Sequence, residues 1–286
     1  MMHKHILTID VEEWYHAELI RKTDRSDSVT TARETISEII ELLALNNAKA
    51  TFFVVGELLK KDPGIGKIIL RNNHELAYHG WSHVPLWRQT RSIFTDEAKQ
   101  FISLAKQIGC EVRGFRAPTA SLDRSTFWIF EELRKLDFTY DSSVFPAKTT
   151  LYGVPNAPVS PYWPSRQRLD KGIEKEESIG IQEFPFLALG PPYLRLPLGT
   201  GFFFRVIPHW FLDFALQKRR KERVPAVISF HTWEFSSDIP IIETTISNKL
   251  YLYTNLAKCK ARLIALLAKF RFTSIDNYIS QSGAVT

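Results

Sequence analysis

The strongest constraint on the fold is the alternation of short apolar segments with segments of helical periodicity. Five segments in the first half are typical of strands: residues 6–9, 50–55, 75–79, 112–116 and 139–142. The segments between them have the apolar spacing of helices, including 57–72 (interrupted at Pro63-Gly64), 95–108 and 125–136. Strands alternating with helices predict parallel strands wrapped by helices, that is, an α/β fold of the β/α barrel type.

A capping box, Thr31-Ala32-Arg33-Glu34, predicts the start of the first long helix. The composition changes at residues 147–178, where four prolines and a run of charged residues predict a long loop that leaves the barrel. Beyond it we expect strands at 181–187 and 194–198, a helix at 209–223, a strand at 226–231, a helix at 244–270 and a closing strand at 272–275. We expect one domain over 1–286, with 1–146 as the first half and 147–286 as the excursion and the remainder.

Charge and cysteine content narrow the class of protein. The formal net charge is +6, and much of the excess lies in Lys218-Arg219-Arg220-Lys221 and Arg223. This cluster is either a solvated helix end or a patch for an anionic partner, and a peripheral membrane contact by 209–223 stays open. No nucleic-acid-binding motif accompanies the charge, so nucleic acid is not expected. Cys110 and Cys259 follow no metal or redox spacing and are expected to be reduced.

The expected location follows from the start of the chain. The first strand begins near His5, and no apolar signal segment precedes it. The most apolar run, 201–216, is too short to span a bilayer and contains Arg205 and Asp213. We therefore expect a cytoplasmic protein.

Polar residues that could carry chemistry stand at the ends of the predicted strands. Asp10 and Glu12 are two apart at the end of the first strand, so both side chains should point to one side, with Glu13 pointing the other way. His79 and His83 are four apart and can converge either on one helix face or in a short loop. Two imidazoles and one carboxylate form a metal site with a position open for water, which is the catalytic arrangement.

Three more residues at strand ends could transfer a proton or hold a group that does. Arg116 ends a strand, and a buried guanidinium there would keep a neighbouring carboxylate ionised. Asp141 and His231 also end strands, and a carboxylate beside an imidazole raises its pKa and fixes its tautomer. The active site of a β/α barrel lies at this end of its strands. The combination predicts a metal-dependent hydrolase of amides or esters.

These motifs resemble those of the polysaccharide deacetylases of the NodB-homology family, carbohydrate esterase family 4. Three segments, 10–16, 115–118 and 140–146, are similar to the exosortase-associated exopolysaccharide deacetylases, as are 202–205 and 229–234. The resemblance implies an irregular barrel of about seven parallel strands. It also implies an N-acetylated glycan as substrate and a divalent metal, Zn²⁺ first and Co²⁺ or Ni²⁺ as alternatives.

The resemblance further implies a role for each matching residue. Asp10 would be the general base, His79 and His83 metal ligands, and His231 the general acid. Arg116 would hold Asp10, and Asp141 would hold His231. Many members have adjacent aspartates in the first motif, but Val11 occupies the second place here, which points to Glu12 as the third metal ligand.

Two other functions stay open. One is an amidase or deformylase acting on a small metabolite, which a closed pocket would favour over a long groove. The other is a non-catalytic glycan-binding homologue. Five tryptophans lie near the motifs and suit sugar rings or core packing, with core packing expected for at least two of them: Trp14, Trp81, Trp87, Trp163 and Trp233. The role of His16 is undefined, beyond a position near the pocket.

Overall fold

A curled parallel sheet forms the centre of the molecule. The computed structural model describes residues 3–20, 31–149 and 152–283. The strands lie in the order β11-β1-β2-β3-β4-β5-β8, all in parallel pairs, and β12 pairs with the start of β1. Their bounds are β1 His5–Val11, β2 Thr51–Val54, β3 Glu75–Tyr78, β4 Gly114–Phe115, β5 Tyr140–Asp141, β8 Gln182–Glu183, β11 Val227–His231 and β12 Phe272–Thr273. The predicted β/α barrel architecture is confirmed.

The two edges of this sheet meet. A parallel bridge joins Phe186, just after β8, to Val227 at the start of β11, and the Leu187 amide donates to the Val227 carbonyl at 2.9 Å. The sheet therefore curls around an interior instead of remaining open, and residues at its carboxyl ends face one another across a small space.

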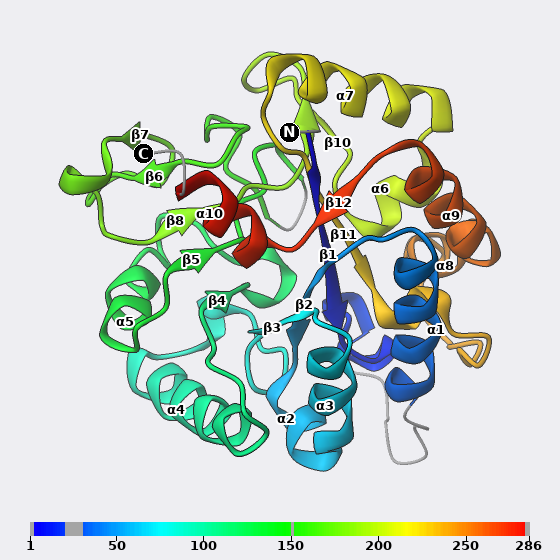
Figure 1. The fold of residues 1–286 in the computed structure, drawn as a ribbon, viewed down its shortest axis with the longest axis horizontal. Coiled ribbons are helices and arrows are strands. Elements are labelled where there is room, and N and C mark those ends of the chain that lie inside the picture. The colour runs from blue at the N-terminus through cyan, green and yellow to red at the C-terminus, as the bar shows by residue number, and fades with distance from the viewer. Residues whose placement is uncertain (1–2, 21–30, 150–151, 284–286) are drawn as a thin grey trace.

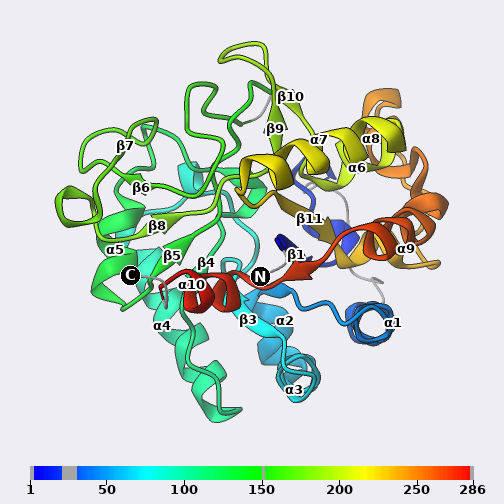
Figure 2. The same cartoon turned by 45° about the horizontal axis from the view of Figure 1, so that its top comes forward.

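Helices surround the sheet, as Figures 1 and 2 show. In the first half they follow the strands in turn, and in the second half they cover the side of β11 and β1. The helices are α1 Ala32–Leu45, α2 Gly56–Lys61, α3 Pro63–Arg71, α4 Arg91–Gln107, α5 Ile129–Lys135, α6 Gly201–Val206, α7 His209–Glu222, α8 Ile246–Tyr253, α9 Cys259–Lys269 and α10 Ile275–Gly283. No helix in the described part of the chain is long and apolar enough to cross a bilayer.

Side-chain alternation on β1 divides the core and orients the site. Leu7, Ile9 and Val11 face outward and pack in the main cluster beneath the helices. Ile6 faces inward and packs with the barrel-interior residues. Because the period of a strand is two, Thr8, Asp10 and Glu12 continue the inward row toward the carboxyl end.

The amino end of the barrel is closed by α10, which the sequence pattern did not predict. Ile275 packs into the barrel interior, and its amide donates to Thr51 Oγ1 at 2.9 Å. The Asp276 amide donates to Glu75 Oε2 at 3.0 Å. The amino end of the barrel interior is therefore filled by residues of α10.

Two local predictions are wrong. Thr31 is the N-cap of α1, but its side chain makes no capping hydrogen bond. Instead, Glu13 Oε1 accepts the amides of Thr31 and Ala32, both at 2.9 Å, so the cap comes from a residue distant in sequence. The single helix expected at 244–270 is two helices, α8 and α9, because Asn255 adopts a left-handed conformation between them (φ 54°).

In the described part of the excursion after β5, the strands outside the main sheet are two residues long each. These are β6 Trp163–Pro164, β7 Gly172–Ile173, β9 Ala188–Leu189 and β10 Leu196–Pro197. β6 pairs with β7 and β9 with β10, both antiparallel and outside the main sheet. The helix expected at 209–223 corresponds to α7, whereas the short helix α6 was not predicted.

Candidate active site

A small pocket lies at the carboxyl ends of the strands. Its lining includes six of the seven residues singled out from the sequence: Asp10, Glu12, His79, His83, Arg116 and His231. The volume of this cavity is about 80 Å³. Residues separated by more than 200 positions thus meet because parallel strands present their carboxyl ends at one edge.

Arg116 lies beneath the pocket and binds the strands together. Its guanidinium donates to Asp10 Oδ1 at 2.7 Å, to the hydroxyls of Thr8, Ser142 and Ser229 at 2.8 Å each, and to the Ser142 carbonyl at 2.8 Å. Its carbon Cζ also lies 4.2 Å and 4.5 Å from the ring centroids of two aromatic residues, Phe53 and Phe186. The predicted contact of Arg116 with Asp10 is confirmed, and the planar donor geometry fixes the carboxylate.

Asp10 is kept ionised although it is buried. Burial alone would raise the pKa of Asp10, but Arg116 and the imidazoles of His79 and His231 lower it below its ordinary value. Its Oδ2 lies 4.0 Å from His79 Nε2 and 3.9 Å from His231 Nε2. Asp10 Oδ2 also accepts from Ser229 Oγ at 3.2 Å, and an ionised carboxylate that lines a pocket can accept a proton.

The two predicted imidazole ligands present their Nε2 atoms to the pocket. His79 Nδ1 donates to the Arg116 carbonyl and His83 Nδ1 to the His16 carbonyl, each at 2.9 Å. Because a carbonyl can only accept, Nδ1 of each ring carries a proton, and the neutral ring has its lone pair on Nε2. Burial lowers the pKa of His79 to about 4, so this ring is neutral at pH 7. This is the tautomer that binds a metal.

Glu12 completes a set that fits a divalent cation. Ligand atoms of Glu12, His79 and His83 all lie within 4.8 Å of one another. Glu12 Oε1 accepts from Trp233 Nε1 at 3.0 Å, and the buried Oε2 faces the ring of His83. His83 Nε2 lies 2.6 Å from that oxygen. A shared proton or a cation can join these two atoms, and two buried imidazoles with one carboxylate are the donor set of a metal site with an open position.

His231 stands on the other side of the pocket and is protonated at neutral pH. Its Nε2 lies 3.8 Å from Glu12 Oε1, and its Nδ1 lies 3.1 Å from Glu234 Oε2. Burial would lower the pKa of His231, but the carboxylates of Glu234, Glu12 and Asp10 raise it to about 9. The ring therefore holds a proton that it can give to a leaving group.

Glu234 contacts His231 and is itself held by Arg205, and the sequence analysis assigned neither residue a role. The two side chains are fully buried, and Arg205 Nε donates to Glu234 Oε1 at 2.8 Å. Arg205 also donates to the carbonyls of Tyr251, Leu252 and Thr254, where α8 ends. The break between α8 and α9 thus leaves terminal carbonyls available for a buried cation. The available signal was the i, i+3 spacing of His231 and Glu234.

The predicted pairing of Asp141 with His231 is wrong. Asp141 is buried on β5 and does not line the pocket. Its carboxylate accepts from Ser143 Oγ at 2.6 Å and from the Ser143 amide at 3.2 Å. Ser143 Oγ in turn accepts the Ala117 amide at 2.7 Å. Asp141 therefore supports the loop that carries Arg116, and Glu234 occupies the position beside His231.

Two residues of the first motif support the site from behind. His16 is buried and does not line the pocket, but its carbonyl fixes the tautomer of His83. Its ring accepts the Glu13 amide on Nδ1 and lies 2.8 Å from Glu57 Oε1 through Nε2. Glu13 points away from the pocket, as predicted, and caps α1.

Two family models match successive parts of the chain. A family model described as polysaccharide deacetylase matches residues 24–140, and a model described as a domain of unknown function, DUF3473, matches residues 142–280. The two matches meet at β5 and together include most of the chain. Residues 24–140 are therefore similar to the polysaccharide deacetylase family, and residues 142–280 are similar to a family without a stated function.

Individual relatives and solved structures match to different extents. The chain is 29% identical over 87 residues to the peptidoglycan-N-acetylglucosamine deacetylase PgdA of Listeria monocytogenes, a match that covers 30% of this chain and only 19% of that relative. Its fold is similar to that of a candidate polysaccharide deacetylase from Mycobacterium smegmatis, with a TM-score of 0.61, 16% identity, and coverage of 98% of this chain and 91% of that chain. The fold of this chain is also similar to that of the allantoinase Puue, with a TM-score of 0.58 and 12% identity. The match covers 94% of this chain and 85% of that chain.

Proposed function

We propose that this protein is a metal-dependent deacetylase that removes N-acetyl groups from a glycan polymer and releases acetate. The observation that carries the proposal is the convergence of a Glu–His–His set with an ionised Asp10 and a protonated His231 in one pocket. A divalent cation, with zinc as first choice for two imidazoles and a carboxylate, would be held by Glu12, His79 and His83. When bound, it supplies Lewis acidity that polarises the acetyl carbonyl and acidifies water.

The protein's own side chains then perform two proton transfers. Asp10, fixed by Arg116, takes the proton of the attacking water as the carbon–oxygen bond forms. His231 donates its Nε2 proton to the sugar nitrogen as the carbon–nitrogen bond breaks, which gives a free amine and acetate. Each residue is in the required protonation state at neutral pH before the reaction, because one pKa is lowered and the other raised.

The surroundings of the pocket favour a polymer over a small metabolite. An adjoining open cavity of about 430 Å³ shares Ala120 and Tyr152 with the pocket. A third cavity of about 470 Å³ shares Asp123, Gly153 and Pro155 with the second. The shared lining residues place the three cavities side by side. Trp87 lines the second cavity and is 38% exposed, which suits stacking on a sugar ring. By contrast, Trp14 is buried in the core, and Trp233 is buried at the pocket wall, where its indole donates to Glu12.

The test is acetate release from N-acetylglucosamine oligomers of increasing length and from small acetamides, with and without a chelator. We expect release that requires metal and that becomes more efficient with chain length. Trp87→Ala should lower kcat/KM for long oligomers and leave the shortest ones unchanged, whereas Trp163→Ala serves as a control outside these cavities. Efficient hydrolysis of small amides alone would instead support the metabolite amidase. No release from any substrate by the metal-loaded protein would favour a binding protein.

A further inference from the structure

We propose that the outer face of α7 docks the protein on an anionic lipid membrane. The proposal does not depend on the deacetylase activity, since no residue of α7 lines the pocket. It starts from two large apolar side chains that the fold leaves in solvent. Trp210 is 70% exposed and Phe214 is 54% exposed, although both lie on a well-packed helix.

The helix presents two distinct faces. Leu212, Ala215, Leu216 and Arg219 are buried against the protein. Trp210, Phe214 and Lys221 recur at i, i+4 and i+11, so they share the opposite face. At the end of the preceding helix, Val206 is also partly exposed. The core therefore does not use the aromatic side of α7.

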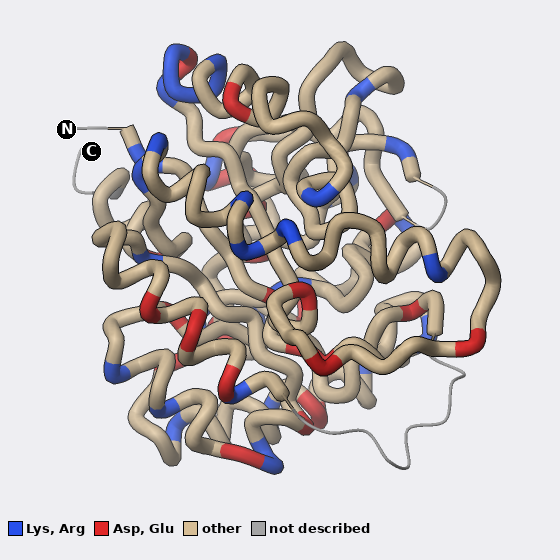
Figure 3. The backbone as a smooth tube through the Cα atoms, turned by 90° about the vertical axis from the view of Figure 1, so that its right-hand side faces the viewer, with Lys and Arg blue, Asp and Glu red and all other residues tan. Residues whose placement is uncertain are grey.

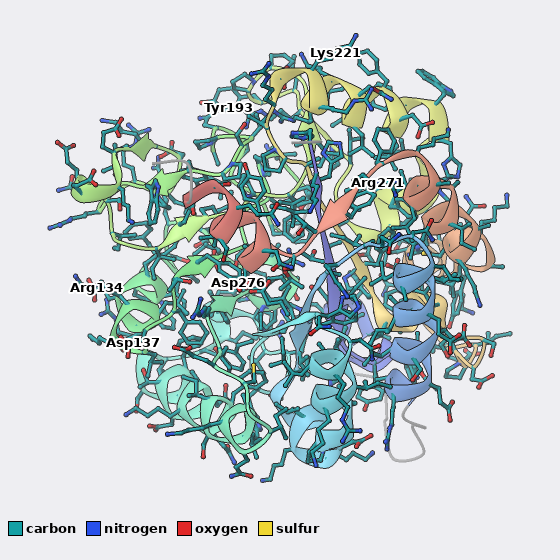
Figure 4. The ribbon with its side chains drawn as sticks, viewed as in Figure 1. Arg134, Asp137, Tyr193, Lys221, Arg271 and Asp276 are labelled. Atoms are coloured by element: carbon teal, nitrogen blue, oxygen red, sulfur yellow. The ribbon has the colours of Figure 1, made fainter. Side chains whose placement is uncertain are left out.

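The same helix ends in a basic cluster, which completes the pattern of an interfacial helix. Figure 3 shows Lys and Arg gathered at one end of α7, and Figure 4 places Lys221 at the outer edge of the molecule. Two nearby acidic groups are already neutralised, because Asp213 contacts Lys269 and Glu222 contacts Lys218 and Arg219.

Three basic side chains are left to act on a partner. In the described part of the chain, no carboxylate lies within ion-pair distance of Arg220, Lys221 or Arg223, all of which are exposed. Aromatic residues that enter the headgroup region, together with cations that attract acidic lipids, are the two components of peripheral membrane binding. This combination favours an anionic bilayer over a neutral one or a second copy of the chain.

The test is co-sedimentation of the full chain with vesicles of phosphatidylcholine alone or mixed with phosphatidylglycerol. We expect binding to the mixed vesicles only, weakening as salt is added. Arg220→Gln with Lys221→Gln should weaken binding about 25-fold, at about 1 kcal/mol for each charge. Trp210→Ala with Phe214→Ala should weaken it by about ten-fold or more.

Matched controls lie on helices away from α7. Lys99→Gln with Lys106→Gln removes the same charge from exposed positions of α4, on the opposite side of the molecule in Figure 1. Leu45→Ala with Ile93→Ala removes exposed apolar side chains from α1 and α4. Both controls should bind like the unchanged protein. Equal binding by the α7 variants, binding to neutral vesicles, or lipid-independent dimerisation lost in the Trp210–Phe214 variant would overturn the proposal.

Discussion

Glu234→Gln tests the assignment of the partner of His231. The substitution keeps the size of the side chain and removes the negative charge that faces His231 Nδ1 at 3.1 Å. A hydrogen bond to a charged group contributes about 1.5–3 kcal/mol, and one pKa unit corresponds to about 1.4 kcal/mol. The pKa of His231, about 9 with Glu234 present, should therefore fall by about one to two units.

The assay is the pH dependence of acetate release. A general acid must be protonated, so the rate should decline as the pH rises through the pKa of His231. We expect the alkaline limb near pH 9 in the unchanged protein to move toward neutral pH in the variant. At the optimum, kcat should fall about ten- to a hundred-fold, because the acid is less well oriented and general acid catalysis contributes about 10²–10⁴.

The pH dependence of folding stability tests the contact between His231 and Glu234 independently of activity. The pKa of His231 is raised from its ordinary value of 6.5, so protonation stabilises the folded state fully below about pH 6.5, and this contribution is lost as the pH rises through about 9. Glu222→Gln removes a carboxylate that pairs with Lys218 and serves as the control for charge. An unchanged alkaline limb in a folded Glu234→Gln variant would refute the assignment.

Three further substitutions test other parts of the structure. Arg116→Lys should lower kcat about 100-fold, since a point charge cannot replace the planar donors that hold Asp10, and oligomer hydrolysis measures this. Gly114→Ala should destabilise the fold by about 3 kcal/mol, because a Cβ would lie 1.9 Å from Tyr140 Cζ, and a normal denaturation midpoint would contradict it. Glu13→Ala should cost about 1 kcal/mol through loss of the α1 cap, measured by urea unfolding, whereas no change would remove the capping role.

The sequence predicted the barrel and most of the site because both depend on strand periodicity. On β1 a period of two is enough to send Asp10 and Glu12 to one side, and parallel pairing is enough to bring His231 beside Asp10. The prediction that His79 and His83 converge did not depend on the conformation of their loop. Two residues four positions apart can bring their rings together either on a helix or in a short loop. These predictions were correct because strand periodicity or parallel strand pairing alone determines where the side chains lie.

The partner of His231 and the break between α8 and α9 depend on contacts between residues that are distant in the sequence. The sequence analysis paired His231 with Asp141, whereas the structure places Glu234 beside His231, held there by Arg205, which also donates to carbonyls at the end of α8. The break at Asn255 likewise serves these contacts, since its side chain donates to the Arg205 carbonyl at 3.2 Å. Apolar periodicity continues across this break, so the pattern indicated one helix.

Equilibrium zinc binding, measured by titration calorimetry on the unchanged protein and two variants, tests the central claim most directly. We expect one equivalent to bind to the unchanged protein and to Asp10→Asn, because Asp10 lies beside the ligand set without belonging to it. His83→Ala should bind none at the same concentrations. Stoichiometric binding by folded His83→Ala would contradict the placement of the metal between Glu12 and the two imidazoles.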